Sequence, residues 1–438
     1  MIQKLRLKNF KSFRDAAVNF GPVSIVLGSN GAGKSNLFDA LRLLKAIGDG
    51  RSVREAVDGH ISPGASLTTV AGVRGGASAA THFMVASDVF VLEVELLVDG
   101  EIIHYMVQVD VKKRTIRNER LSSNKHPGQY VYNTRPGTDP LEQDPDSPVV
   151  TARFYKETRG RNPRRDFSPN EFILSQFVSR RAESRLNEVV ADRVREEFES
   201  LRPLELRPEV LRQYSTLGRT ELGEHGENFA AVVWQLLEDT KPVRQRIRRS
   251  NGEFATVVVR DDGAVARLAS INEWLAELTP RPVVSIETES APTGEVIFAV
   301  QEEPFETRVA APSLSDGTLR FAALSLATVG AKGRQTLVIE ELENGINPAR
   351  LSLLVKMIEQ AARANGEVQV IASTHSPAVL DYADRKTIND SIVIGWDHEG
   401  MASRPVSVAH LPSLAEAMSE RTLGELQAEG WLQLAAEA

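Results

Sequence analysis

The sequence predicts a mixed α/β fold with an antiparallel β subdomain and a mostly helical insert. The first indication is a unit of strand, glycine-rich loop and helix. The apolar run VSIVL at 23–27 leads into GSNGAGKS at 28–35, and Leu37, Leu41 and Leu44 follow at helical spacing. The second is a hairpin pattern in the first third of the chain, and the third is helical periodicity in its middle.

Composition limits the classes of protein that the chain can belong to. Its 438 residues are enough for two or three domains at about 150 residues each. The absence of cysteine excludes disulfide scaffolds, thiolate metal sites and cysteine nucleophiles. A formal net charge of −7 means that any nucleic-acid contact must come from local basic patches. No apolar stretch reaches a membrane span and the N-terminus lacks the apolar core of a secretory signal, so we expect a cytoplasmic protein without a membrane partner.

The elements of the first half follow from local patterns. Residues 4–13 alternate, with Leu5 and Leu7 on one face and basic residues on the other, which predicts a strand. Residues 89–111 predict a hairpin, because two alternating runs flank Asp99–Gly100, a dipeptide that favours a tight turn. The proline-rich stretch 126–148 is expected to be irregular. Two further strands are predicted, at 151–155 and at 171–176 (EFILSQ).

The second half is predicted to begin with helices and to return to strands. Helical spacing covers most of 178–280, with helices near 186–201, 229–238 and 271–278. Strands are then predicted at 283–286, 296–300, 337–339, 368–371 and 392–394. We therefore divide the chain into an N-terminal lobe (1–177), a mostly helical insert (178–280) and a C-terminal lobe (281–438).

The glycine-rich loop fits the pattern G-x-x-x-x-G-K-[ST], which is typical of nucleotide-phosphate binding. Its backbone N–H groups can form an anion nest, and the following helix adds the positive end of its dipole. Lys34 would reach the β- and γ-phosphates, and Ser35 would bind Mg²⁺. The predicted nucleotide contacts in the loop are Asn30, Gly31, Ala32, Gly33, Lys34, Ser35 and Asn36. Taken alone, the loop leaves kinases, GTPases, AAA+ motors and ABC-type ATPases open, as well as a glycine loop without a ligand.

Three later segments narrow this choice. Residues 314–321 (LSDGTLRF) precede a predicted helix, and taken alone they are an ordinary helix N-cap. Residues 336–341 (TLVIEE) are a buried strand that ends in two acids, which can hold a metal's water shell and orient a hydrolytic water. Residues 372–377 (ASTHSP) end another strand, and a lone histidine there is usually structural.

In their order and spacing, these segments resemble those of one family. The segments IQKLRLKNFKSF, VSIVLGSNGAGKSNLFDALRLL, LSDGTLRFAALSLAT, TLVIEELENGINP and VIASTHSP resemble the SMC/RecF/OLD branch of ABC-type ATPases, in particular the stand-alone AAA_21-type members. They cover 70 of the 438 residues. The resemblance implies an ABC-type P-loop ATPase head that binds ATP and Mg²⁺ and hydrolyses ATP.

The resemblance also implies roles for individual residues. Ser315 and Gly317 match the ABC signature, which contacts the γ-phosphate bound by an opposite subunit. Glu340 takes the metal-binding Walker B position, where the family usually has aspartate, and Glu341 matches the catalytic glutamate. Asn347 matches the D-loop, which contacts its counterpart across a dimer.

Two further residues complete the predicted site. His375 matches the switch histidine that senses the γ-phosphate. Gln176 is our candidate for the glutamine that reaches Mg²⁺ and water, with an ordinary polar residue at a strand end as the alternative. The family arrangement implies a homodimer with ATP sandwiched between two heads, and it leaves higher assembly open.

The process that such an ATPase would drive is less evident from the sequence. Basic residues cluster at 156–165, at Arg180–Arg181 and at 241–249, either as a DNA phosphate footprint or as solvated faces. The stretch that follows His375 is short and contains no acid pair of the DxD type, so no intrinsic nuclease is expected. The resemblance suggests a separately encoded effector, with antiphage defence and DNA repair both open. The alternative function is the nucleotide-binding subunit of a membrane transporter.

Overall fold

The computed structural model describes residues 1–62, 68–70, 72–125, 130–135, 147–156, 162–178, 185–218, 220–248, 254–279, 282–303, 307–364 and 366–438. The chain forms two compact units. Unit 1 comprises Met1–Arg202, Gln369–Pro377 and Asp384–Ala438. Unit 2 comprises Pro203–Val368 and Ala378–Ala383. In the part of the chain that the structure describes, no helix has the length and apolar character needed to span a bilayer.

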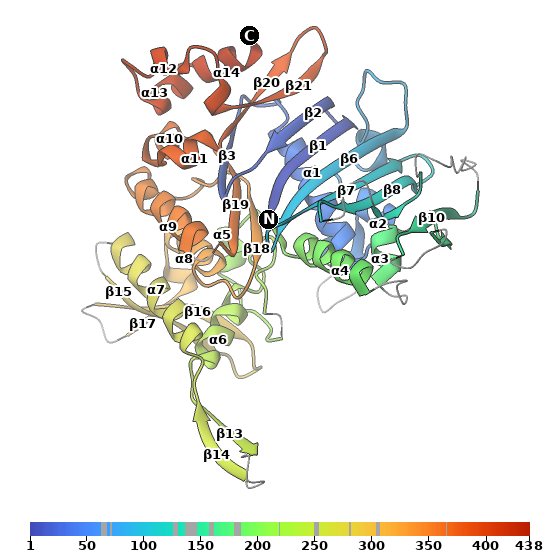
Figure 1. Ribbon diagram of the computed structural model, residues 1–438. Coiled ribbons are helices and arrows are strands. Elements are labelled where there is room, and N and C mark those ends of the chain that lie inside the picture. The colour runs from blue at the N-terminus through green and yellow to red at the C-terminus, as the bar shows by residue number, and fades with distance from the viewer. Residues whose placement is uncertain are drawn as a thin grey trace. The chain divides into compact units, whose positions relative to one another are not determined.

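Unit 1 contains a large antiparallel sheet, coloured from blue to teal in Figure 1. Its strands, in spatial order, are β11 (Arg164–Phe167), β10 (Val150–Phe154), β9 (Tyr130–Asn133), β8 (Thr115–Ser123), β7 (Glu101–Asp110), β6 (Val89–Val98), β1 (Ile2–Phe10) and β2 (Phe13–Asn19). The β6–β7 hairpin is confirmed: Asp99 and Gly100 have φ angles of 49° and 72°, and a tight primed turn needs positive φ at both positions. In β1, Leu5 and Leu7 are buried, as the alternation predicts.

The second sheet of unit 1 carries the glycine-rich loop. In this sheet β3 (Val23–Leu27) lies between β19 (Val368–Ser373) and β20 (Ile392–Asp397) and runs parallel to both, while β21 (Ala402–Ser407) pairs antiparallel with β20. All five residues of β3 are buried, as expected for a central strand covered on both faces. A short hairpin, β4 (His60–Ser62) and β5 (Thr68–Val70), completes the strands of this unit.

Helices of unit 1 pack against these sheets through aromatic contacts. Phe198 meets Tyr105 edge-on at 5.3 Å between ring centroids, and Phe177 stacks on Phe154 at 4.9 Å. The helices are α1 (Lys34–Gly48), α2 (Val53–Asp58), α3 (Ile173–Val178), α4 (Arg185–Glu199), α11 (Arg385–Asn389), α12 (Leu414–Ala417), α13 (Leu423–Ala428) and α14 (Trp431–Glu437).

Unit 2 combines helices with a three-stranded sheet and a separate two-stranded ribbon. Its helices are α5 (Pro208–Leu211), α6 (Phe229–Asp239), α7 (Asp262–Leu278), α8 (Asp316–Thr328) and α9 (Leu351–Ala364). Its strands are β13 (Val243–Arg248), β14 (Phe254–Val259), β15 (Val283–Ser290), β16 (Val296–Glu302), β17 (Arg308–Ala310) and β18 (Gln335–Ile339). The boundary segments are β12 (Leu201–Leu204) and α10 (Pro377–Tyr382).

The predicted fold class is confirmed, with differences in individual elements. The strand predicted at 171–176 is wrong, because Ile173–Val178 is the helix α3. The helix expected at 271–278 begins earlier, at Asp262, where Asp261 caps it by accepting a hydrogen bond from the Ala264 N–H. The middle of the chain also contains the ribbon β13–β14, which the sequence analysis missed. Within the stretch 126–148, Tyr130–Asn133 forms β9, and most of the remainder lies outside the described residues.

Candidate functional site

The glycine-rich loop has the backbone geometry of a phosphate nest. It connects β3 to α1 through Gly28, Gly31 and Gly33, whose φ angles of 147°, 82° and 113° favour glycine. A Cβ added at Gly31 would meet nothing within 4 Å, so the loop is open there, whereas one at Gly33 would overlap the hydroxyls of Ser403 and Ser12. The loop therefore offers N–H donors at the start of a 15-residue helix, which suits a phosphate group.

The side chain of Lys34, the first residue of α1, folds back onto the glycine-rich loop. Its Nζ donates hydrogen bonds to the carbonyl oxygens of Gly28 at 2.6 Å and Ser29 at 3.1 Å, and its side chain is 8% exposed. This places a buried cation at the loop, where an anionic ligand would be attracted to it. The next residue, Ser35, is exposed at the first turn of α1, so its hydroxyl is accessible to a metal ion.

Two serines from opposite ends of the chain, together with Asn36 of α1, hold the loop in place. The Ser403 hydroxyl donates to the Ala32 carbonyl at 2.5 Å and therefore accepts from the Ser12 hydroxyl, which lies 2.7 Å from it. The Asn36 amide donates to the same Ser12 oxygen at 2.7 Å. Residues 12 and 403 were not predicted as site residues. Their contact depends on the pairing of segments from opposite ends of the chain, which leaves no local signal in the sequence.

His375 lies at the same edge of the sheet as the glycine-rich loop. It follows β19, the parallel neighbour of β3, and the register pairs Ser373 with Val26. Because carboxyl ends of parallel neighbours meet at one edge, unit 1 places the exposed His375 and the loop at the same edge of the sheet.

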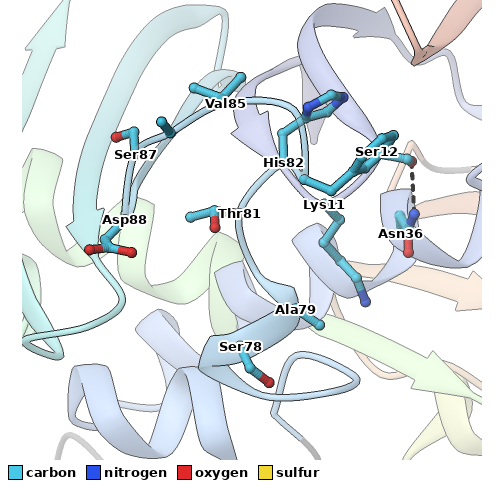
Figure 2. A pocket seen from close by; sticks show the side chains of 12 residues that line it. Lys11, Ser12, Asn36, Ser78, Ala79, Thr81, His82, Val85, Ser87 and Asp88 are labelled. Atoms are coloured by element: carbon cyan, nitrogen blue, oxygen red, sulfur yellow. Dashed lines mark hydrogen bonds between the residues drawn. The ribbon is translucent and has the colours of Figure 1, made fainter.

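A pocket of about 600 Å³ adjoins the loop through Ser12 and Asn36. Figure 2 shows the side chains that line it, with the hydrogen bond between Asn36 and Ser12 on one side and Asp88 on the other. Phe83 lines the pocket with 62% of its surface exposed. Lys11 also lines the pocket and forms an ion pair with the fully buried Asp39 of α1.

His82, beside Phe83 in this pocket, has a defined tautomer. Its Nδ1 accepts a hydrogen bond from the Met84 N–H at 3.2 Å, so its Nε2 carries the proton toward the Met401 carbonyl at 3.1 Å. Burial lowers the pKa of His82 below its usual value. The ring therefore remains neutral at physiological pH and stacks on Phe83 at 4.7 Å between centroids.

Unit 2 carries the LSDG segment. Ser315 is the N-cap of α8, and its hydroxyl accepts a hydrogen bond from the Thr318 N–H at 3.1 Å. The Arg212 guanidinium donates to the Asp316 carboxylate and to the Leu314 carbonyl, at 2.5 and 2.9 Å, which fixes the approach to the helix. Ser315 itself is exposed.

Gly317 lies against the turn that contains Asn347. A Cβ at Gly317 would come within 2.8 Å of the Gly345 carbonyl oxygen, so only glycine allows this approach. Asn347 is exposed and caps the following turn by accepting a hydrogen bond from the Ala349 N–H at 3.0 Å. Unit 2 therefore brings Gly317 close to the turn that contains Asn347.

Glu340 and Glu341 follow β18 directly, as predicted. Glu341 is exposed and has a φ angle of 53°, a left-handed conformation that is costly for a residue with a Cβ and that clusters at functional sites. Its carbonyl oxygen accepts hydrogen bonds from the Asn344 N–H at 3.0 Å and from Arg320 Nη2 at 3.2 Å. In the described residues, no group of three or more His, Asp or Glu side chains forms a ready-made metal site.

Arg320 connects the signature helix to this turn. It is 3% exposed, and its Nη1 also donates to the Leu206 carbonyl at 2.6 Å. Burial lowers the pKa of Arg320, while the nearby Glu341 and Glu343 act in the opposite direction. Arg320 was not predicted as a site residue, although its place in the segment LSDGTLRF offered a signal.

Gln176 lies away from the glycine-rich loop. Its amide forms hydrogen bonds with the backbone of Ser168 and Glu171. The adjacent Ser175 hydroxyl donates to the carbonyl of Ile47, which lies in the last turn of α1, whereas the loop precedes the first. At a rise of about 1.5 Å per residue, this contact is about 20 Å along the helix from the loop. The metal role of Gln176 stays a prediction, and this arrangement does not support it.

Comparison with known proteins gives two distant relatives. The chain is 28% identical to the chromosome partition protein Smc of Bordetella petrii over 297 residues, 61% of this chain and 22% of the relative. It is 49% identical to an ATP/GTP phosphatase of Helicobacter pylori over 45 residues, 10% of this chain and 12% of the relative. The chain thus spans less than a quarter of the length of either relative.

Among solved structures, an Smc head bound to the C-terminal winged-helix domain of ScpA matches with a TM-score of 0.49 at 14% identity, covering 95% of this chain and 99% of that one. The Smc head domain of Thermotoga maritima matches with a TM-score of 0.41 at 13% identity, covering 93% and 98%. The family AAA_21, described as "AAA domain, putative AbiEii toxin, Type IV TA system", matches residues 23–381. Because this match covers most of the chain, including the loop and the segments around Ser315 and Glu341, the chain belongs to the AAA_21 family of P-loop ATPase domains.

Proposed function

We propose that the protein hydrolyses ATP in a Mg²⁺-dependent reaction. The observation that carries this proposal is the phosphate nest, with Lys34 buried in it and Ser35 exposed beside it. Mg²⁺ would neutralise charge on the phosphates. The Ser35 hydroxyl would hold the ion beside the loop, and the family resemblance gives Glu340 the metal-binding Walker B role. Glu341 would orient the attacking water, and His375 would contact the γ-phosphate.

The pocket beside the loop is our candidate for the nucleoside part of ATP. It continues from the phosphate nest through Asn36 and Ser12, and its size suits a base and a ribose. The exposed ring of Phe83, backed by neutral His82, offers a face on which a base can stack.

We further propose that ATP joins two copies of the chain. Ser315 is exposed at the N-terminus of the 13-residue helix α8, where a phosphate from another molecule can approach. The resemblance of LSDG to the ABC signature supports this arrangement, with Asn347 contributing from the D-loop. Each nucleotide would then be held by the loop of one copy and by the signature of the other, and hydrolysis would release the pair.

We propose that this cycle controls a DNA-associated process or a separately encoded effector protein, in antiphage defence or DNA repair. The support is the family membership and the distant similarity to an Smc protein. Sequencing the neighbouring genes tests this part: a linked nuclease or toxin gene favours defence, and linked recombination genes favour repair.

A mixing experiment tests the shared site. The variants Lys34→Ala and Ser315→Arg should each lack ATPase activity, because each homodimer has both sites damaged. In an equimolar mixture, half of the dimers are mixed, and each of these has one site with an intact loop and an intact signature. We expect the mixture to recover up to about a quarter of the wild-type rate.

The matched control mixes Lys34→Ala with Glu341→Gln. By the family resemblance, the glutamate acts on the nucleotide held by the loop of its own chain, so neither site of the mixed dimer is intact. This mixture should remain inactive. Equal activity of the two mixtures, or full activity of Ser315→Arg alone, would contradict the shared site.

A further inference from the structure

The ribbon β13–β14 of unit 2 is a sheet of its own. Its strands pair antiparallel with each other from Val243 with Val259 to Arg248 with Phe254, and among the described residues they pair with no other strand. Figure 1 shows the ribbon extending as an arm beyond α6 and β16 of the same unit. An isolated two-stranded ribbon is only marginally stable in water. A contribution to the core of unit 2 therefore does not explain why the chain forms this ribbon.

The ribbon concentrates positive charge in an acidic protein. Residues 241–260 contain six lysines or arginines and one glutamate, a formal charge of +5. Because the whole chain carries −7, the remaining residues carry −12. Positive charge concentrated in one segment of an acidic protein indicates a surface that binds a polyanion. A face that contacts only solvent would not need a charge opposite in sign to that of the remaining residues.

The arginines follow the strand period. Positions 244, 246 and 248 of β13 are all arginine, and alternate positions of a strand share one face. At about 3.4 Å per residue, neighbouring positions on this face are about 7 Å apart. The three arginine positions therefore lie along one face of β13.

The described ends of the ribbon are open to solvent. Arg244 is exposed, and it makes no ion pair with the residues that the structure describes. Opposite it in the register, Val258 is 66% exposed, and Val243 on the same strand as Arg244 is 55% exposed. Arg260, just after β14, is also exposed.

We propose that this ribbon binds the phosphate backbone of duplex DNA. A two-stranded ribbon fits the major groove, and a row of arginines on one face can contact successive phosphates without reading the bases. A second copy of the same ribbon is a poor partner, because two arginine rows repel each other. This proposal does not rest on ATP hydrolysis by the protein.

The test measures the binding of a fluorescently labelled 30-base-pair duplex by anisotropy, without nucleotide, at several salt concentrations. The variant is Arg244→Gln with Arg246→Gln and Arg248→Gln. Each phosphate contact contributes about 0.9 to the slope of log affinity against log salt, so loss of three contacts should reduce the slope by about 2.7. At low salt we expect binding to weaken by at least about tenfold.

The matched control removes three exposed cations elsewhere, Lys356→Gln, Arg385→Gln and Lys386→Gln, with the same change in net charge. It should bind the duplex like the wild type. Replacing the three ribbon arginines by lysine should restore binding, because the charges return. Melting curves of all variants establish that unit 2 remains folded.

Three outcomes would overturn the proposal. The wild type fails to bind the duplex at low salt, the glutamine variant binds as tightly as the control, or polyglutamate at equal charge concentration displaces the duplex completely. The last outcome would assign the ribbon to an acidic protein partner. Because the measurement contains no nucleotide, inactivity of the ATPase would leave these results unaffected.

Discussion

Unit 1 and unit 2 carry opposite halves of the predicted chemistry. Unit 1 offers donors and positive charge to an anion: the open loop at Gly31, the ammonium of Lys34 and the exposed His375. Unit 2 offers carboxylates, with Glu340 and Glu341 at the end of β18 and the cation Arg320 buried behind them. The phosphate loop is thus in unit 1, whereas unit 2 carries the carboxylates suited to activating water and the exposed Ser315 that is proposed to contact a nucleotide bound by another copy.

This difference means that binding and hydrolysis can be separated by substitution. A change in the loop removes an interaction made with the nucleotide both before and during the reaction, so it weakens binding. A change at Glu341 removes an interaction with water that contributes mainly in the transition state.

Lys34→Ala should abolish detectable ATP binding, because it removes the buried cation of the nest. Isothermal titration calorimetry with ATP and Mg²⁺ measures this, and we expect affinity to fall by at least about 100-fold. The melting temperature without ATP controls for folding. Tight ATP binding by this variant would contradict the proposal that unit 1 binds the nucleotide.

Glu341→Gln should retain ATP binding and lose turnover. General base catalysis typically contributes a factor of about 10² to 10⁴, so kcat should fall within that range. Dimers should accumulate when ATP is added, as measured by light scattering after gel filtration. Normal turnover by this variant would contradict the role of Glu341.

Arg320→Lys should lower kcat by about tenfold with little effect on ATP affinity. Lysine preserves the charge but cannot donate to the carbonyls of both Leu206 and Glu341, so the turn at Glu341 would lose one of its supports. A hydrogen bond from a charged group contributes about 1.5–3 kcal/mol, so unit 2 should also unfold at a lower temperature. An unchanged kcat in a destabilised variant would show that Arg320 is only structural.

Phe83→Ala should weaken ATP binding by about two- to tenfold, the range expected for loss of one aromatic contact of about 0.5–1.5 kcal/mol. Met84→Ala is the control, because Met84 is equally exposed and does not line the pocket. The kcat at saturating ATP should be similar in both variants. Equal affinities of the two variants would place the base elsewhere.

The free energy of unfolding of unit 1 should depend on pH partly through the ionisation of Glu119. Burial raises the pKa of this carboxyl to about 7, although Tyr132 and the N–H groups of Leu174 and Ile173 donate hydrogen bonds to it. Since this pKa exceeds that of the unfolded chain, the free energy of unfolding should fall as the pH rises from about 4.5 to 7, and then level off. Glu119→Gln should flatten this slope in urea titrations at pH 5, 6, 7 and 8.

Glu101 provides the matched control for this measurement. It too is buried, which alone would raise its pKa, but hydrogen bonds and charge from Ser123, Lys125 and Arg193 lower the pKa instead. Glu101→Gln should therefore leave the Glu119 slope in place. A slope that persists unchanged in Glu119→Gln would show that another group causes it.

The sequence predicted what local patterns determine. The β6–β7 hairpin follows from alternation and Asp99–Gly100, and β3, the loop and α1 follow from a contiguous motif. Ser315 caps α8 as its position in LSDGT predicts. Each of these elements is encoded by one short, contiguous segment.

Elements that depend on distant contacts were missed. The segment EFILSQ is short and apolar, and its structure depends on the side chain of Glu119 in β8. The Glu119 carboxyl group accepts hydrogen bonds from the N–H groups of Ile173 at 2.7 Å and Leu174 at 2.9 Å. This contact satisfies the free donors at the start of α3 and favours a helix. The pocket beside the loop was missed for the same reason, because it joins residues near 12, 36 and 80.

The left-handed backbone at Glu341 limits which amino acids that position accepts. Valine, isoleucine and threonine would strain the turn, whereas asparagine, aspartate and glycine adopt it readily. An inactive relative with a substitution at this position is therefore expected to carry one of those three residues. Loss of hydrolysis could then occur without loss of the fold, leaving a nucleotide-holding protein that functions as a scaffold.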